Sequence, residues 1–171
     1  MSGLPSKVAV VGAGTMGNGI VQTFAANGVP TVMVDVQQDA LDRGMAAIAK
    51  SLGRFVKKEK ITADDAAAIE GRITPATDLA HVAGCDLVVE AVTENLAIKE
   101  KIFAAADEHL GADAILASNT SSISITVLAS KTQRSDRVIG MHFMNPVPLM
   151  KLVEVIRGED TSDATTSRVM G

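Results

Sequence analysis

The sequence has few aromatic side chains and one cysteine, and both shortages exclude whole classes of protein. Its 171 residues include four Phe but no Trp and no Tyr, so few side chains could stack on the bases of a nucleic acid. The formal net charge of −4 also argues against a nucleic acid or an anionic membrane as the main partner. Cys85, as the single cysteine, offers no intramolecular disulfide and no thiolate cluster, and we expect no metal site.

Long hydrophobic runs are also missing. No stretch approaches the ~18 consecutive apolar residues of a transmembrane helix, and the N-terminal residues lack the apolar segment of a signal peptide. We therefore expect a cytoplasmic protein. The chain does contain 47% hydrophobic residues against 21% charged ones, which at this length suits a single globular α/β domain over residues 1–171.

The strongest pattern is an apolar run that leads directly into closely spaced glycines. Residues 8–11 read Val-Ala-Val-Val, which is typical of a strand covered by helices on both faces. Gly12, Gly14 and Gly17 follow with the spacing G-x-G-x-x-G. The first glycine allows a tight turn, the second leaves room for a pyrophosphate, and the third lets the next helix lie close to the strand. The N-terminus of that helix would hold the phosphates.

A glycine motif alone is a weak signal, so the residues around it decide the interpretation. A helical pattern follows and ends at Asn27-Gly28, and a second apolar strand at residues 31–34 leads to Asp35. This acid stands roughly 20 residues after the glycines, where a dinucleotide-binding domain places the carboxylate that binds the adenosine ribose. The order of strand, turn, helix, strand and acid predicts a bound dinucleotide rather than an empty glycine turn.

Apolar strands and amphipathic helices continue to alternate along the rest of the chain. This alternation predicts a Rossmann-type doubly wound, mainly parallel sheet with helices on both faces. Further strands are expected at residues 72–74, 86–92, 114–117, 137–141 and 151–156. Further helices are expected from residues 37–39 to about 57, from 62 to 71, from 96 to 110, from 123 to 128, and from near 161.

Polar residues follow two of the expected strands at the edge where a parallel sheet binds its ligand. Glu94 and Lys99 come after one strand, which places them near the expected path of the cofactor. The run Ser118–Ser122 comes after the next strand, and it could either line this crevice or simply cap the helix that begins at Ile123. The last strand contains one carboxylate, Glu154, in an apolar run, so we expect it to be buried and paired.

Five motifs in this order resemble the 3-hydroxyacyl-CoA dehydrogenases, and most closely the bacterial 3-hydroxybutyryl-CoA dehydrogenases. They are Gly-Ala-Gly-Thr-Met-Gly at 12–17, Val-Glu-Ala-Val-Thr-Glu-Asn at 89–95, Ser-Asn-Thr-Ser-Ser at 118–122, His-Phe-Met-Asn-Pro-Val-Pro at 142–148, and Lys-Leu-Val-Glu-Val-Ile at 151–156. The resemblance covers essentially the whole chain. It implies an oxidoreductase that transfers a hydride between the C3 hydroxyl of an acyl-CoA and NAD, in fatty acid or butanoate metabolism.

The resemblance also implies a role for each of several residues. His142 would be the catalytic base, a task that suits a neutral imidazole, and Glu154 would orient it. Ser121 would hydrogen-bond the substrate oxygen, and Asn145 would lie near the nicotinamide. The residues implied in cofactor binding are Gly12, Gly14, Thr15, Met16, Gly17, Asp35, Glu94, Lys99, Ser121 and Asn145. The residues implied in binding the 3-hydroxyacyl-CoA or 3-ketoacyl-CoA substrate are Ser51, Lys58 and Ser121.

The family continues with a helical domain of roughly one hundred residues that forms most of a homodimer contact, and this domain is absent from the chain. A dimer through that missing part is therefore expected. A non-catalytic dinucleotide-binding protein on the same fold, such as a sensor or a crystallin, is the main alternative, but it would not need both His142 and Glu154. A 6-phosphogluconate-like dehydrogenase is a second alternative, and the motifs at 118–122 and 142–146 argue against it.

Overall fold

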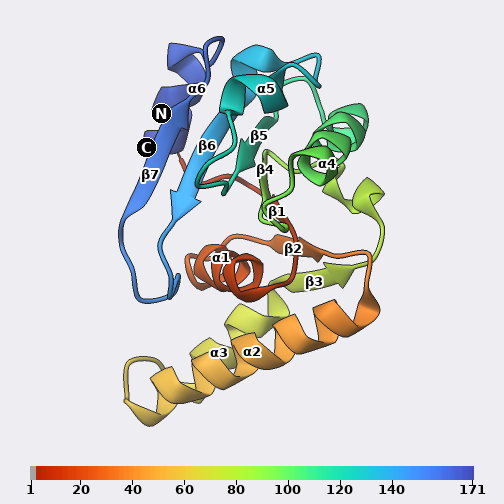
Figure 1. Ribbon diagram of the computed structural model, residues 1–171. Helices are drawn as coiled ribbons and strands as arrows, with labels where there is room; N and C mark the ends of the chain where they lie inside the picture. Colours follow the sequence, from red (N-terminus) through yellow and green to blue (C-terminus); the bar gives the residue numbers. More distant parts are fainter. Residues whose placement is uncertain (1–2) are drawn as a thin grey trace.

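The apolar run at residues 8–11 forms a central strand of the sheet. In the computed structural model, which describes residues 3–171, β1 (Val8–Val11) pairs in parallel with β2 (Thr31–Val34) on one side and with β4 (Leu87–Glu90) on the other. Every residue of these three strands is buried. Helices cover both faces of the sheet, which is why the strands are apolar throughout (Figure 1).

The sheet has seven strands in the order β3-β2-β1-β4-β5-β6-β7. The remaining strands are β3 (Ile73–Ala76), β5 (Ile115–Ser118), β6 (Val138–Phe143) and β7 (Val153–Arg157). The first six strands are parallel, and β7 runs antiparallel to β6. The chain moves outward from β1 to β3 and then returns to β4, so the strand order reverses between β1 and β4. The predicted doubly wound, mainly parallel sheet is confirmed.

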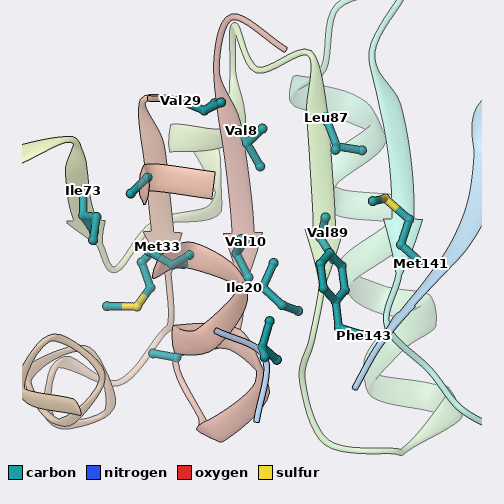
Figure 2. Packing of buried hydrophobic residues seen from close by; sticks show 14 of the residues in the cluster. Val8, Val10, Ile20, Val29, Met33, Ile73, Leu87, Val89, Met141 and Phe143 are labelled. Carbon is teal, nitrogen blue, oxygen red and sulfur yellow. The ribbon is translucent and has the colours of Figure 1, made fainter. Parts of the chain in front are cut away.

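Alternate residues of each strand face two separate cores. One core packs against three helices, α1 (Thr15–Ala26), α2 (Gln38–Lys57) and α3 (Ala63–Gly71), and Figure 2 shows Val8 and Val10 on this side with Ile20. The other core packs against three helices on the opposite face: η1 (Leu79–Val82), α4 (Leu96–His109) and α5 (Ile125–Ala129). The short η2 (Ser135–Arg137) precedes β6, and α6 (Asp163–Met170) packs beside β6 and β7.

The junction between β1 and α1 has the geometry that the glycine spacing predicts. Gly12 has a φ of +111°, a conformation that L side chains rarely adopt. A Cβ added at Gly17 would lie only 1.8 Å from the carbonyl oxygen of Gly12, so α1 can approach β1 this closely only with glycine there. At its other end α1 stops at Asn27, and Gly28 follows with a φ of +86°.

Several predicted boundaries are wrong by a few residues. The strand expected to end before Pro75 continues through it, because β3 lies at the edge of the sheet, where a missing N–H is tolerated. The strand expected to end at Met141 runs on to Phe143 and therefore includes His142. The helix expected at Ile123 begins at Ile125 and is capped by Ser124, so the run at residues 118–122 does not cap it.

No helix within residues 3–171 combines the length and the apolar character needed to cross a membrane. Cys85 is buried, as expected for a small apolar residue, and burial raises the pKa of its thiol.

Candidate active site

The N-terminus of α1 is open at the point where the glycine motif predicts phosphates. Gly14 is the N-cap residue and provides no side-chain cap, so the N–H groups of the first turn lack the usual side-chain partner. A Cβ added at Gly14 would meet no atom within 4 Å, so the space above it is free. Both features fit a pyrophosphate lying against the backbone of this turn.

Asp35 lies beside this turn at the end of β2 and is hydrogen-bonded to it. One carboxylate oxygen, Oδ2, accepts the backbone N–H of Ala13 at 3.0 Å, and Oδ1 accepts the backbone N–H of Gln37 at 3.0 Å. Each oxygen of an ionised carboxylate has a second acceptor position, which leaves capacity for the hydroxyls of a ribose. The sequence pattern predicted the ribose contact but not the two backbone contacts that hold the carboxylate in place.

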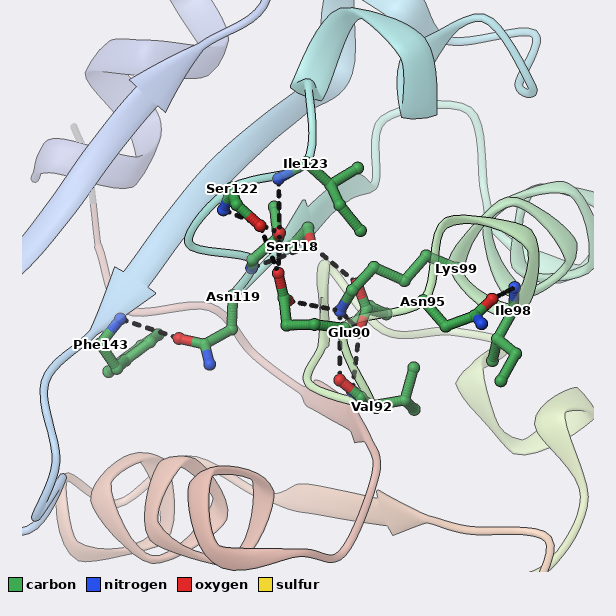
Figure 3. Close-up of polar contacts among 12 residues, drawn as sticks. Glu90, Val92, Asn95, Ile98, Lys99, Ser118, Asn119, Ser122, Ile123 and Phe143 are labelled. Carbon is green, nitrogen blue, oxygen red and sulfur yellow. Dashed lines mark hydrogen bonds and ion pairs between the residues drawn. The ribbon is translucent and has the colours of Figure 1, made fainter.

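A fully buried carboxylate lies between the ends of β4 and β5 (Figure 3). Glu90 is 0% exposed, and its Oε1 accepts the hydroxyl of Ser118 at 2.7 Å. Its Oε2 accepts the ammonium group of Lys99 at 2.6 Å and the backbone N–H of Val92 at 2.8 Å. Glu90 was not among the predicted site residues, and Ser118 was considered only as part of the run at 118–122, for which lining the crevice was one of two interpretations. The signal for Glu90 was a single acid at the end of an otherwise apolar strand.

Glu94 connects this buried pair to the loop after β5. Its Oε1 lies 3.3 Å from Nζ of Lys99, and its Oε2 accepts the hydroxyls of Thr120 at 2.8 Å and Ser122 at 3.1 Å. Partial burial pushes the pKa of Glu94 upward, but the hydrogen bond from Thr120, the charge and hydrogen bond of Lys99 and the hydrogen bond from Ser122 outweigh it. The pKa of Glu94 therefore lies below its usual value.

Lys99 occupies a different position from the one the sequence predicted. It was expected to line the cofactor cleft, but it is 1% exposed, and its ammonium group contacts Glu90, Glu94 and the carbonyl oxygen of Val92. It lies beneath the crevice because burying a lysine is tolerated when carboxylates surround its charge. Its place in this structure is that of a shared counter-ion.

Ser121 lies at the exposed tip of this loop, between two residues that are fixed. Thr120 and Ser122 are both bonded to Glu94, while the side chain of Ser121 makes no hydrogen bond within residues 3–171. Asn119 ties the same loop to β6, because its Oδ1 accepts the backbone N–H of Phe143 at 2.9 Å. The backbone at Ser121 is thus held by its neighbours, and the hydroxyl of Ser121 is open to a ligand.

His142 and Glu154 face each other across β6 and β7. The antiparallel register places the two residues directly opposite, and Nδ1 of His142 lies 2.9 Å from Oε2 of Glu154. The expected pairing of Glu154 is confirmed, but its expected burial is wrong, because its side chain is 54% exposed. The reason is that β7 lies at the edge of the sheet, with a neighbouring strand on one side only, and the helix that packs beside it, α6, leaves the Glu154 side chain half-exposed. If Nδ1 donates its proton to the carboxylate, Nε2 carries the free lone pair.

Ser121, His142 and Glu154 line one hollow of about 360 Å³. It lies between the loop after β5 and the end of β7, and Arg157 also contributes to its wall. Three of the four predicted catalytic residues are therefore brought together, although they come from three different segments of the chain.

The fourth predicted catalytic residue, Asn145, lines a neighbouring hollow of about 430 Å³. Ser51 and Lys58 of the predicted substrate site lie there too, and so does Lys60, which belongs to the same basic end of the helix. Arg54 also lines this hollow and was not predicted. Ser51, Arg54 and Lys58 stand three and four residues apart, the spacing that places side chains on one face of a helix. This spacing could have revealed the added positive charge.

The open glycine turn and the acid after β2 lie beside the reversal of strand order, as in dinucleotide-binding domains. An imidazole–carboxylate pair lies at the same end of the sheet, and together these features are those of a dinucleotide-binding dehydrogenase domain. A family profile described as 3-hydroxyacyl-CoA dehydrogenase, NAD binding domain, matches residues 7–171. The chain belongs to this family, and NAD as its cofactor is confirmed.

Similar proteins agree with this family. The chain is 53% identical to a probable 3-hydroxybutyryl-CoA dehydrogenase from Deinococcus radiodurans, in an alignment that covers 93% of this chain and 57% of the relative. It is 49% identical to a 3-hydroxybutyryl-CoA dehydrogenase from Bradyrhizobium diazoefficiens, covering 96% of this chain and 56% of that one.

A crystal structure of (S)-3-hydroxybutyryl-CoA dehydrogenase from Ralstonia eutropha superposes with a TM-score of 0.94 and 52% identity. The alignment covers 96% of this chain and 58% of that one. The chain thus spans a little more than half the length of the relatives that it matches.

Proposed function

We propose that this chain is the NAD-binding and catalytic-base domain of an L-3-hydroxyacyl-CoA dehydrogenase that acts on short acyl chains such as 3-hydroxybutyryl-CoA. The observation that carries the proposal is the contact of 2.9 Å between His142 and Glu154, on the wall of a hollow that also holds Ser121. The names of the relatives at about 50% identity support the acyl-CoA substrate.

In this proposal His142 takes up the proton of the substrate's 3-hydroxyl group at Nε2. Glu154 accepts the hydrogen bond from Nδ1, which fixes the tautomer of the neutral ring and stabilises the imidazolium that forms. Ser121 donates a hydrogen bond to the substrate oxygen and holds it near Nε2. NAD, when bound, supplies the acceptor for the hydride that leaves C3. In the reverse direction His142 returns its proton to the oxygen.

The cofactor would be held by the residues of the glycine turn and the strand ends. The first turn of α1, including Thr15 and Met16, would bind the pyrophosphate, and Asp35 would bind the adenosine ribose. The nicotinamide half would then extend to the other side of the strand-order reversal, toward Glu94, Ser121 and Asn145. These contacts are supported by the position of all of these residues at one end of the sheet.

The coenzyme A part of the substrate would lie in the hollow of about 430 Å³. Ser51 supplies a hydroxyl there, and Lys58, Arg54 and Lys60 supply positive charge for a phosphate group. The segment after β6 links this hollow to the His142 hollow, because it begins next to His142 and its residues 145–149 line the hollow of about 430 Å³. We propose that the elongated substrate follows this segment.

The non-catalytic alternative is less well supported. A sensor or a crystallin needs the glycine turn and Asp35, but it has no use for a base and an orienting acid placed opposite each other. We also propose that the active protein is cytoplasmic, works in butanoate or fatty acid metabolism, and forms a homodimer through a helical domain that follows this one. The greater length of the relatives supports the further domain.

The proposal is tested by an assay of NADH oxidation with acetoacetyl-CoA as the oxidant. The 171-residue chain and a form extended to the length of the relatives are compared, with free acetoacetate as the control substrate. We expect acetoacetyl-CoA to support turnover in the extended form, and the short chain to bind NADH but turn over poorly, because part of the substrate cleft is missing. If the extended form binds NADH but oxidises it no faster with acetoacetyl-CoA, the proposed activity is wrong. Full activity per site in the short chain would contradict the need for a second domain.

A further inference from the structure

Glu90, Lys99 and Glu94 form a single charged cluster, which we call the Glu-Lys-Glu unit. Lys99 lies 2.6 Å from Glu90 and 3.3 Å from Glu94, so one ammonium group serves two carboxylates. The unit as a whole therefore has a net charge of −1. Glu90 and Lys99 are sealed from water, while Glu94 is 43% exposed. The unbalanced negative charge of the unit is consequently presented to solvent at Glu94.

The charge of Glu94 persists at neutral pH. Its carboxylate receives hydrogen bonds from Thr120 and Ser122 in addition to the contact with Lys99, and its pKa lies below the usual value although partial burial opposes this. The other acid near the middle of α4, Glu100, lies 3.4 Å from Lys131 and so has a cation of its own. The Glu100–Lys131 pair is neutral as a whole, so it does not add to the negative charge of the Glu-Lys-Glu unit.

Glu94 lies on the half of the crevice that is opposite to Asp35. Asp35 follows β2, on one side of the reversal of strand order, and Glu94 follows β4, on the other side. A dinucleotide that places its adenosine at Asp35 and its phosphates at α1 must extend its second half over the ends of β4 and β5. The same half holds the loop with Ser121 that lines the His142 hollow, where hydride transfer would occur.

We propose that Glu94, held by buried Lys99 and Glu90, sets the preference of the site between oxidised and reduced cofactor. The nicotinamide ring carries a positive charge in NAD⁺ and none in NADH. A fixed negative charge near the ring therefore stabilises the bound oxidised form and leaves the reduced form nearly unaffected. This role rests on the proposed function, since it requires NAD to bind in the orientation described.

The test is a pair of titrations, in which the dissociation constants of NAD⁺ and NADH are measured by calorimetry on the 171-residue chain and its variants. Glu94→Gln keeps the size of the side chain and removes its charge. We expect the ratio Kd(NAD⁺)/Kd(NADH) to rise about fivefold, the effect of one charge at a partly exposed site. General damage to the site would weaken both forms alike and leave this ratio unchanged.

Two further variants sharpen the test. Glu108→Gln also removes one negative charge, but near the far end of α4, at least about 13 Å along the helix axis from Lys99. It should leave the ratio within about twofold. Glu90→Gln removes the charge of the buried partner and should shift the ratio in the same direction as Glu94→Gln, by a smaller factor. The wild-type ratio at increasing salt gives a result even if a variant fails to fold, because salt screens the exposed charge of Glu94 and should raise the ratio.

The outcomes separate the two proposals. If wild-type chain binds both cofactors but neither variant changes the ratio, the charge of the Glu-Lys-Glu unit does not act on the nicotinamide and the inference is overturned. A ratio that changes equally in Glu108→Gln would overturn it as well, because the effect would then be one of overall charge. If wild-type chain binds neither NAD⁺ nor NADH, the proposed function itself fails.

Discussion

Asp35 is fixed before any cofactor arrives, because backbone N–H groups of Ala13 and Gln37 hold both of its oxygens. This preorganised carboxylate suits two ribose hydroxyls and repels a phosphate attached to the same ribose. The side chains that follow, Gln37 and Gln38, provide no positive charge to offset that repulsion.

The first prediction therefore concerns the choice of cofactor. NADH should bind at least tenfold more tightly than NADPH, a difference of about 1.4 kcal/mol. Titration of both cofactors into the same preparation measures this directly. Asp42→Asn, which removes an exposed charge nearby on α2, is the control for general charge effects and should leave the preference for NADH unchanged. Equal affinities, or a preference for NADPH, would show that Asp35 does not bind the ribose.

At the same scale, Glu154 is half-exposed and still pairs with His142. A half-exposed polar contact of this kind adds little to stability, so it is better explained by what it does for the imidazole than by what it does for the fold.

The second prediction is that Glu154→Gln lowers turnover in the extended protein, because the amide stabilises an imidazolium less well than a carboxylate does. The double variant His142→Gln/Glu154→Gln should be scarcely slower than His142→Gln alone, since residues that act as one unit are not additive. Glu159→Gln, an exposed acid just after β7, is the matched control. Independent, multiplying losses in the two single variants would mean that the two residues do not work as a pair.

At the scale of elements, the first strand–helix–strand unit was predictable from sequence because its signals are local. The tight turn at Gly12, the close approach at Gly17 and the reversal at Gly28 just after α1 each depend on one residue and its immediate neighbours. The capped start of α3 is local in the same sense, since Thr62 and Asp65 bond reciprocally to each other's backbone.

The features that the sequence could not provide depend on segments distant in the chain. The apolar residues around Glu154 in the sequence predict a buried side chain. Its actual exposure follows from the position of β7 at the edge of the sheet. Lys99 appears to be a surface cation on a helix, but Glu90 from another element makes its burial possible. Asn145 stands close to His142 in sequence and yet lines the other hollow.

The third prediction concerns the N-terminal segment, which Asp86 ties to the start of β4. Hydrogen bonds from the hydroxyl and backbone N–H of Ser6 to Oδ2, both 2.6 Å, lower the pKa of Asp86. A carboxyl with a lowered pKa in the folded state stabilises the fold above its unfolded pKa of about 3.9 and loses this contribution as the pH falls through the lower, folded value.

The contribution of Asp86 to the melting temperature should thus be nearly constant from about pH 7 to 5 and should fall below about pH 4. Asp86→Asn should lower the melting temperature by roughly a few degrees at pH 7 and by less at pH 3, where the wild-type carboxyl is itself largely protonated. Circular dichroism at both pH values is sufficient, with the exposed Asp160→Asn as the control. A loss that is the same at both pH values would show that the charge of Asp86 plays no part.

At the scale of the whole molecule, the functional residues gather at one end of the sheet because six parallel strands end there. Asp35, Glu94, Ser121 and His142 come from the ends of four different strands or the loops that follow them. The strands supply a rigid frame, and the loops at their ends can carry different polar residues without disturbing the two cores. This explains how one arrangement holds a cofactor site, a base and a separate basic hollow.

The central claim is that this domain both binds NAD and carries the catalytic base. The most direct test is the turnover of acetoacetyl-CoA and NADH by the extended protein with His142→Gln, relative to wild type. We predict a decrease of roughly 10²–10⁴-fold, the usual contribution of a positioned general base, with the affinity for NADH nearly unchanged. Near-normal turnover in His142→Gln would contradict the account and would favour the non-catalytic interpretation of this fold.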